Sequence, residues 1–207
     1  VKAVFEGYQA FADVTELVRN AGAGTYTVAN VKCDTLKITN AFGGWTMVVI
    51  YSDPALPLRN LTVFDGLAVI GTSGGGLYTT RDITVNGFKC PPEGIISAKI
   101  GVVAYDGDRG AKDGFYVKAN SNGSYINQTS TGESASVLSN ANDCWNSSIT
   151  DKGMLVTSRM PAHANTYGYD AHMYTLNNTG NKYLGNGDNT ATIRINTPSN
   201  GEGFALG

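Results

Sequence analysis

The sequence predicts an all-β protein, an antiparallel β-sandwich or jelly roll with one short helix near its N-terminus. Charged residues make up only 15% of the 207 residues, against about 25% in an average domain. Because surface helices draw on Glu, Lys, Arg and Gln, a chain so poor in these residues is not mainly helical. Apolar and polar residues alternate in short segments between Gly, Asn and Pro turn signals, and no long amphipathic helix is available to connect parallel strands. An antiparallel arrangement follows.

The length and the charge balance narrow the functional classes. A chain of 207 residues fits a single domain, residues 1–207. Fifteen basic and seventeen acidic residues leave a net charge of −2, which provides no electrostatic attraction to a nucleic acid or an anionic membrane. No apolar run is long enough to span a bilayer. We therefore expect neither a nucleic-acid partner nor a membrane span.

The first predicted element is a short helix near the start of the chain. Asp13 can cap its first turn, and Glu16 follows three residues later as in a capping box. The Gly22 and Gly24 pair then ends the helix.

Strands follow, because from residue 25 onward the apolar pattern has a period of two. Residues 45–51 are apolar on both faces and rich in β-branched and aromatic side chains, which predicts a central strand covered on both sides. Residues 120–146 consist mainly of Ser, Thr, Asn and Gly, which is typical of a long exposed loop. The predicted strands are 25–31, 36–39, 45–51, 60–70, 81–88, 95–105, 114–119, 154–158, 167–174 and 191–196.

Asp106, Asp108 and Asp113 form the strongest local pattern that could carry chemistry. Carboxylates at alternate positions with Gly between them let a loop turn its oxygens inward, which is how Ca²⁺ is held. The loop lacks the bidentate Glu of an EF-hand, and Arg109 inside it could act as an internal counter-ion. The alternatives to calcium are a structural Asp–Arg hydrogen-bond network and an ordinary hairpin turn.

Asp143 and Trp145 suggest a second site, a surface that contacts glycans. Carboxylate and amide groups beside an aromatic ring are the usual equipment of a sugar-binding surface. The alternative is a loop whose Asn and Asp residues satisfy their own turns while Trp145 fills the core. Sequons for N-glycosylation also occur, although a chain rich in Asn and Thr produces them by chance. They start at Asn60, Asn122, Asn127, Asn146 and Asn177.

We expect no enzymatic activity. His163 and His172 are the only bases that titrate near neutral pH, and neither belongs to a known catalytic motif. Each is better explained as a surface residue or a hydrogen-bonded structural residue. Pairing of Cys144 with a histidine would be the remaining nucleophilic combination. Cys33, Cys90 and Cys144 have no metal-binding spacing and allow at most one internal disulfide, so that one thiol is left buried or bonds a neighbouring chain.

Several segments, taken in order along the chain, resemble one family. They are GYQAFADVT (7–15), GTYTVANV (24–31), GGW (43–45), DP (53–54), PLRNLTVFDG (57–66), GVVAY (101–105), GDRG (107–110) and NSSI (146–149). The family is the β-rich module of large exported bacterial surface proteins, which often precedes tandem immunoglobulin-like repeats. The resemblance implies an extracellular or cell-surface location with the signal peptide already removed, a β-sandwich, and a role in surface structure or adhesion, with no catalytic residues to carry over.

The sequence departs from this family at both ends. The family has a pair of strands before the position of residue 7 and a closing strand after residues 204–207, and neither is present here. A sandwich without its outer strands exposes unpaired backbone and an apolar groove. The start of the chain, residues 1–6, has the pattern of an edge strand or of a strand donated to a neighbouring copy, with Val1, Ala3, Val4 and Phe5 as interface residues.

Two functions are therefore expected from the sequence. The first is a secreted structural protein that forms a pilus-like filament or a surface layer as a homo-oligomer or polymer, held together by β-strand exchange. The alternative is a calcium-dependent, lectin-like adhesin that binds carbohydrate.

Overall fold

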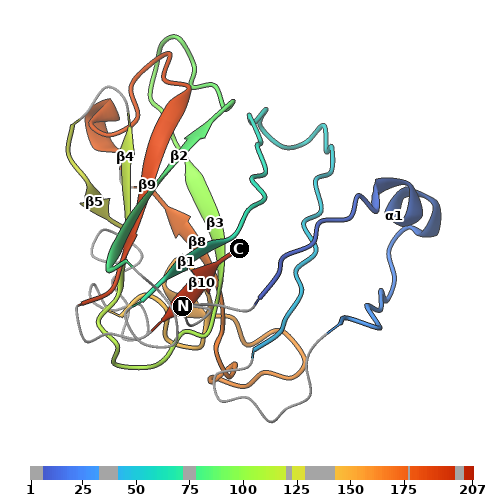
Figure 1. The fold of residues 1–207 in the computed structure, drawn as a ribbon. Helices are drawn as coiled ribbons and strands as arrows, with labels where there is room; N and C mark the ends of the chain where they lie inside the picture. The colour runs from blue at the N-terminus through green and yellow to red at the C-terminus, as the bar shows by residue number, and fades with distance from the viewer. Residues whose placement is uncertain are drawn as a thin grey trace.

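Two β-sheets face each other across a shared core in the computed structural model (Figure 1). The structure describes residues 7–32, 42–71, 78–119, 123–128, 143–176, 178–198 and 203–207. Within these ranges no helix is long or apolar enough to cross a membrane.

The sheets contain six and four strands. In spatial order the larger sheet contains β1 (Ala68–Ile70), β10 (Phe204–Leu206), β3 (Lys99–Tyr105), β8 (Tyr169–Thr175), β6 (Ile149–Asp151) and β7 (Met154–Leu155). The smaller sheet contains β2 (Thr80–Asn86), β9 (Thr190–Asn196), β4 (Gly114–Ala119) and β5 (Ile126–Asn127). All pairs are antiparallel except β6 and β8. The predicted all-β sandwich is confirmed.

Aromatic side chains fill the space between the two sheets. The Trp145 ring lies 5.7 Å from Phe115 of β4 and 5.6 Å from Phe204 of β10, measured between ring centroids. Phe115 also stacks on Tyr174 of β8 at 5.6 Å. Trp145, Phe115 and Tyr174 are fully buried. Burial of side chains this large dominates the energetics of a core.

The predicted helix near the N-terminus is present as α1 (Thr15–Ala21). The N-cap residue is Val14, which makes no side-chain cap hydrogen bond, so the predicted capping box of Asp13 and Glu16 is not formed. Asp13 precedes the cap, and its carboxylate accepts a hydrogen bond from the Thr15 N–H at 2.9 Å. The helix ends at Gly22, whose φ of +70° favours glycine. None of its residues is buried, so α1 packs against no core. A single short 3-10 helix, η2 (Thr179–Asn181), is the other helical element of the described residues.

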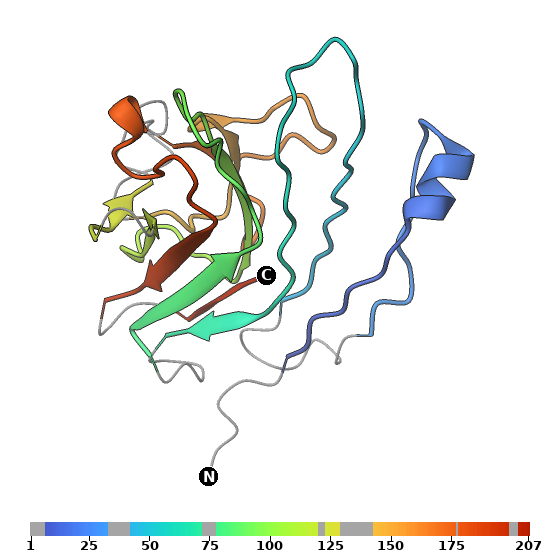
Figure 2. The ribbon, with the colours of Figure 1, turned by 90° about the horizontal axis from the view of Figure 1, so that it is seen from above.

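Two long segments lie outside both sheets, the N-terminal arm (residues 7–32) and the hairpin arm (residues 42–67) (Figure 2). The hairpin arm turns at Asp53, whose carbonyl accepts the Leu56 N–H at 3.1 Å. No strand ladder includes either arm within the described ranges. The predicted strand at residues 25–31 is therefore absent, and of the one predicted at residues 60–70 only β1 remains. The predicted strand at residues 36–39 lies outside the described residues.

The prediction of a buried central strand at residues 45–51 is wrong in this structure. The side chains of Trp45 and Tyr51 are 48% and 71% exposed. A segment that is apolar on both faces needs a layer on each side. The hairpin arm lies between the larger sheet and the N-terminal arm (Figure 2), and Gln9 Nε2 of the N-terminal arm donates to Asp65 Oδ1 at 2.8 Å. The large apolar side chains of residues 48–51 nevertheless stay about half exposed or more.

The arms form a partial third layer over the outer face of the larger sheet. Ile100, Val102 and Ala104 of β3 pack into the core, so the alternation of a strand turns Gly101, Val103 and Tyr105 to the opposite face. Phe42 of the hairpin arm stacks on Tyr105 at 5.9 Å. Gly44 approaches the same ring so closely that a Cβ would lie 2.8 Å from it. Thr46 Oγ1 is 2.7 Å from the Tyr169 hydroxyl.

The predicted exposed loop at residues 120–146 is corrected at two points. Ile126 and Asn127 pair with β4 as strand β5. At the other end, Cys144, Trp145 and Asn146 are buried, because Trp145 supplies apolar area that a sandwich core takes up. Residues 120–122 and 129–142 lie outside the described part of the chain.

Candidate functional site

The largest cluster of buried polar groups lies where residues 143–148 cross one end of the core. Asp113 is 1% exposed, and its Oδ1 accepts the N–H groups of Cys144 at 2.7 Å and Trp145 at 2.9 Å. Hydrogen bonds from backbone N–H groups to a carboxylate are among the stronger ones in proteins. Asp113 therefore fixes the main chain that places the Trp145 ring between the sheets.

Asp170 holds the next part of the same segment. Its Oδ1 accepts the N–H groups of Asn146 at 3.0 Å and Ser148 at 2.9 Å. Ser147 lies between them and donates its hydroxyl to the Gly107 carbonyl at 2.6 Å. Gly107 is required there, because a Cβ would lie 2.2 Å from Asp170 Oδ2. Two buried carboxylates thus bind four backbone N–H groups in one short segment.

Asp170 also forms a buried row with His172 and Thr150. The His172 Nε2 lies 3.3 Å from Asp170 Oδ1, and its Nδ1 lies 2.7 Å from Thr150 Oγ1. The side chains of Asp170 and His172 are both fully buried, and the His172 ring packs against Trp145 at 5.8 Å. The arrangement of hydroxyl, imidazole and carboxylate resembles a catalytic triad in order only, because no substrate can reach it. His172 is a hydrogen-bonded structural residue, as predicted.

The three predicted calcium ligands have different surroundings. Asp113 uses its Oδ1 for the two backbone N–H groups, whereas Asp106 is half-buried in a turn and Asp108 is exposed. Within the described ranges the structure brings together no group of three His, Cys, Asp or Glu side chains that could hold a metal. Calcium binding by these residues stays a prediction without structural support. Arg109 donates to the backbone carbonyls of Asn146 and Ala164 rather than to an Asp, so the predicted Asp–Arg network is not present in that form.

The pKa of Asp106 leads to a testable prediction about stability. Burial, and to a smaller extent the neighbouring Asp108 carboxylate, raises the pKa of Asp106 from 3.8 to about 6. Between pH 4 and 6 the folded protein therefore binds this proton more tightly than the unfolded chain does, and stability falls as the pH rises through that window. We expect Asp106→Asn to be more stable than the wild type at pH 7.5 by about 1 kcal/mol, because solvent reduces the effect at a half-exposed site. Thermal unfolding at pH 7.5 and 4 measures it, and the two proteins should unfold alike at pH 4.

The choice of asparagine keeps the backbone of this test unchanged. Asp106 has a φ of +67°, and Asn tolerates that region. A variant that is no more stable than the wild type at pH 7.5 would contradict the raised pKa. Added calcium distinguishes a loop that binds the ion from a loop that merely contains a half-buried carboxyl group. If the loop binds calcium, the ion should stabilise the wild type and leave Asp106→Asn unaffected.

The predicted glycan contact at Asp143 and Trp145 is wrong for Trp145, which is 0% exposed. The alternative explanation, a tryptophan that fills the core, is the one that the structure shows. Asp143 accepts the Gly110 N–H through both oxygens, at 2.9 and 3.0 Å. It therefore joins the loop before β4 to the segment at residues 143–148, as Asp113 also does.

The sequons differ in accessibility. Asn60 is exposed and Asn127 is half-buried on β5. Asn146 is buried, and its Nδ2 donates to the Asp143 carbonyl at 3.1 Å. Glycosylation of Asn146 in the folded protein is therefore excluded, because the nitrogen that would carry the glycan faces the interior. Asn122 and Asn177 lie outside the described residues.

Among the described residues, Cys90 and Cys144 form no reactive pair with His163. Cys144 is buried, and burial, followed by the Asp113 carboxylate, raises the pKa of its thiol well above 9.0. A protonated thiol is a weak nucleophile. Cys90 and Cys144 are both free and buried, whereas His163 lies in an exposed loop. Cys33 lies outside the described residues.

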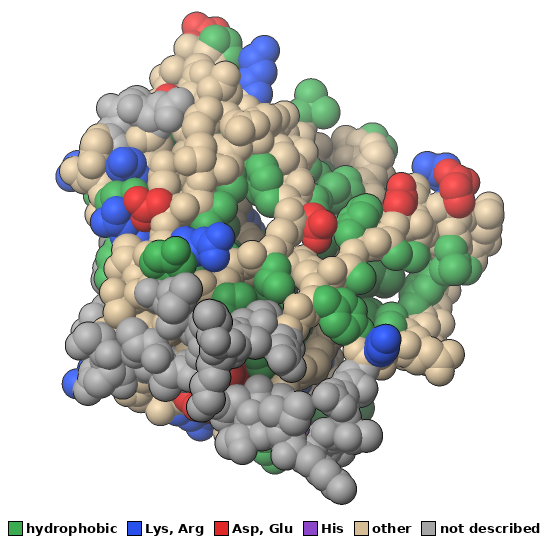
Figure 3. Space-filling model, viewed as in Figure 1, with side chains coloured by type: hydrophobic (Ala, Val, Ile, Leu, Met, Phe, Trp, Pro, Cys, Tyr) green, Lys and Arg blue, Asp and Glu red, His purple; other side chains and the backbone are tan. Residues whose placement is uncertain are grey.

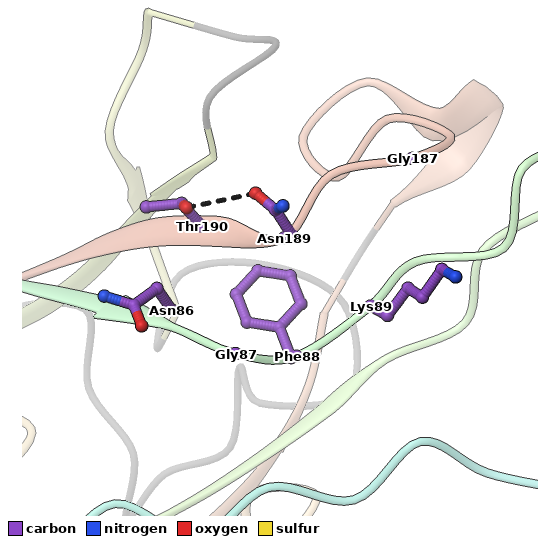
Figure 4. A pocket seen from close by; sticks show the side chains of 7 residues that line it. All are labelled: Asn86, Gly87, Phe88, Lys89, Gly187, Asn189 and Thr190. Atoms are coloured by element: carbon purple, nitrogen blue, oxygen red, sulfur yellow. Dashed lines mark hydrogen bonds between the residues drawn. The ribbon is translucent and has the colours of Figure 1, made fainter.

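One candidate site was missed by sequence analysis, a pocket of about 540 Å³ where β2 ends and β9 begins (Figure 4). We call it the Phe88 pocket. Residues 86–89 form one side, and Gly187, Asn189 and Thr190 form the other. Its only signal in the sequence is the occurrence of Asn and Gly near residue 86 and again near residue 188, about a hundred residues later. The order of the residues along the chain does not show that these two segments lie side by side.

Comparison with family models, with curated proteins and with solved structures finds no match to this chain. The resemblance to exported surface modules stays a prediction. The predicted interface residues Val1, Ala3, Val4 and Phe5 lie outside the described part of the chain.

Proposed function

We propose that this chain is a secreted or cell-surface structural protein without catalytic activity, and that its copies associate by β-strand exchange into an extracellular filament or surface layer. The observation that carries the proposal is the hairpin arm, which has the composition of a strand and lies outside both sheets. A partner strand would pair its main chain and cover its apolar side chains. Strand addition to an exposed segment is a recurring mode of protein association.

The exposed apolar residues of the described chain concentrate in the two arms. Of the twenty-two large hydrophobic side chains that are exposed, sixteen lie between Tyr8 and Phe64. Figure 3 shows hydrophobic side chains along both arms. Monomeric proteins rarely expose contiguous apolar patches of this kind, and such patches mark interaction sites.

A second copy of the chain is the partner that fits best, because each copy offers both halves of the contact. The hairpin arm provides an unpaired strand. The outer face of the larger sheet provides an apolar surface, and the arms cover only part of it. Met173 and Gly101 remain exposed there, next to Val103 and Ala171. A donor on one surface and an acceptor on another produce a head-to-tail contact, which repeats from copy to copy.

The apolar side chains of the hairpin arm contribute part of the energy of such a contact. Burial of one fully exposed Val, Ile or Phe side chain contributes about 1.5–3 kcal/mol, and the exposed residues between Trp45 and Tyr51 are already partly covered, so that together they contribute on the order of 5 kcal/mol. Association costs an estimated 4–15 kcal/mol. Main-chain hydrogen bonds and the rest of the arm add to the favourable side.

Sedimentation velocity over a range of micromolar concentrations, together with negative-stain electron microscopy, tests the proposal. We expect association that increases with concentration, and fibres or sheets with a regular repeat. A folded monomer at every concentration would contradict self-association. Removal of residues 1–6 separately tests the predicted donor strand.

A further inference from the structure

We propose that the Phe88 pocket binds one uncharged sugar unit of a glycan without a metal ion. This site is independent of the self-association proposed above. Its volume of about 540 Å³ lies within the range of about 300–1,000 Å³ found for small-ligand sites. The pocket is open to solvent on one side, as is needed for a sugar that continues into a longer chain.

The Phe88 ring provides an apolar platform in this pocket. It packs against both apolar clusters of the core, which fixes its position, and its remaining surface lines the pocket (Figure 4). A pyranose ring presents C–H groups on one face, and these pack on the electron-rich face of an aromatic ring. The platform therefore favours a ring-shaped ligand with an apolar face.

Amide groups beside the ring suit the hydroxyls of the same ligand. Asn86 and Asn189 both line the pocket (Figure 4). The Thr190 hydroxyl donates to Asn189 Oδ1 at 3.2 Å, which leaves the Asn189 NH₂ group to donate to a ligand. The side-chain amide of Asn86 bonds no described residue. An amide both donates and accepts, as a hydroxyl does.

The charges of the lining favour an uncharged sugar. Lys89 is the only charged residue among those that line the pocket, and its side chain extends away from the Phe88 ring (Figure 4). No carboxylate lines the pocket, so it lacks the charged ligands that give calcium sites their affinity. Recognition then depends on stacking and on neutral hydrogen bonds.

The two sides of the pocket are held in place by the main chain. The Gly87 N–H donates to the Asn189 carbonyl at 3.2 Å, and the Cys90 N–H donates to the Asp188 carbonyl at 2.8 Å. On the outer side, the Lys89 N–H donates to Asn60 Oδ1 at 2.9 Å. A site that is already ordered loses less entropy when its ligand binds.

A glycan array probed with the full chain, made without glycosylation, tests the proposal. We expect binding of neutral glycans that persists in EDTA. The double variant Asn86→Ala/Asn189→Ala should lower the affinity about tenfold or more. Asn20→Ala, which removes an exposed amide of α1 far from the pocket, should bind as the wild type does.

Phe88→Leu separates the platform from general packing, because Leu keeps an apolar side chain and removes the ring. Its melting temperature shows whether the fold is retained, and we expect the affinity to fall about tenfold. Absence of any bound glycan, binding of acidic glycans only, loss of binding in EDTA, or unchanged affinity in the double variant would each overturn the proposal. A folded Phe88→Leu variant that binds as tightly as the wild type would do so as well.

Discussion

Replacement of Ile50 by proline is expected to abolish self-association while the sandwich remains folded. Ile50 is 57% exposed in the hairpin arm, and among the described residues its N–H donates to no partner. Proline removes that N–H, which a donated strand would need, and it interrupts a strand ladder. We expect the complex to dissociate to monomer in sedimentation velocity and the fibres or sheets to disappear from electron micrographs. The melting temperature of the monomer should change by less than about 2 °C, which corresponds to about 0.5 kcal/mol, because the residue lies outside both sheets.

Two matched variants show whether the main chain is the cause. Ile50→Val keeps the N–H, the β-branched shape and most of the apolar surface, so it should assemble as the wild type does. Ile95→Thr removes an apolar side chain that is 88% exposed outside the arms, and it should also assemble normally. Assembly of Ile50→Pro at wild-type concentrations would rule out the hairpin arm as a paired strand.

Asp113→Ala is expected to produce the largest loss of stability. It leaves the N–H groups of Cys144 and Trp145 buried without their acceptor. Each buried group left without a partner costs about 1–3 kcal/mol, so we expect the free energy of unfolding to fall by about 3–5 kcal/mol. That is a large part of the 5–15 kcal/mol typical of a domain. Denaturant unfolding followed by Trp fluorescence measures the loss, since Trp145 should become exposed first.

Asp143→Ala is the matched control for this loss. It removes the same kind of side chain from the same cluster, but its bond to the Gly110 N–H is at an exposed position, where water replaces the lost acceptor. We expect a loss below about 1 kcal/mol. Asp113→Asn should be intermediate, because the amide oxygen still accepts but without charge. Equal losses for Asp113→Ala and Asp143→Ala would show that the buried bonds are not the cause.

The alternation of apolar and polar residues sufficed to predict those strands that pair with other strands of the same chain. The strand predicted at residues 114–119 is β4 with the same bounds, and the one predicted at residues 81–88 differs from β2 by one or two residues at each end. In both strands every second side chain faces the core, and this arrangement gives the sequence an apolar period of two. The helix at α1 was predictable for a similar reason, since Gly22, which ends it, is a local signal.

Residues 45–51 and Trp145 show where local pattern fails. The composition of residues 45–51 correctly indicates a segment that needs cover on both faces, but it does not say which molecule supplies the cover. Trp145 lies at the end of a stretch rich in Ser, Thr and Asn, so its polar neighbours indicate an exposed loop. Its burial depends on Asp113, more than thirty residues earlier in the chain. Such long-range bonds, like the pairing of β2 with β9 that forms the Phe88 pocket, leave no periodic signal.

The place of β10 in the larger sheet constrains the order in which the protein folds. Residues 204–206 lie between β1 and β3, and the only strand that pairs with β1 in the described part of the chain is β10. During synthesis β1 therefore stays without this partner until residues 204–206 have left the ribosome. Until then β1 presents an open strand edge to which another chain can pair.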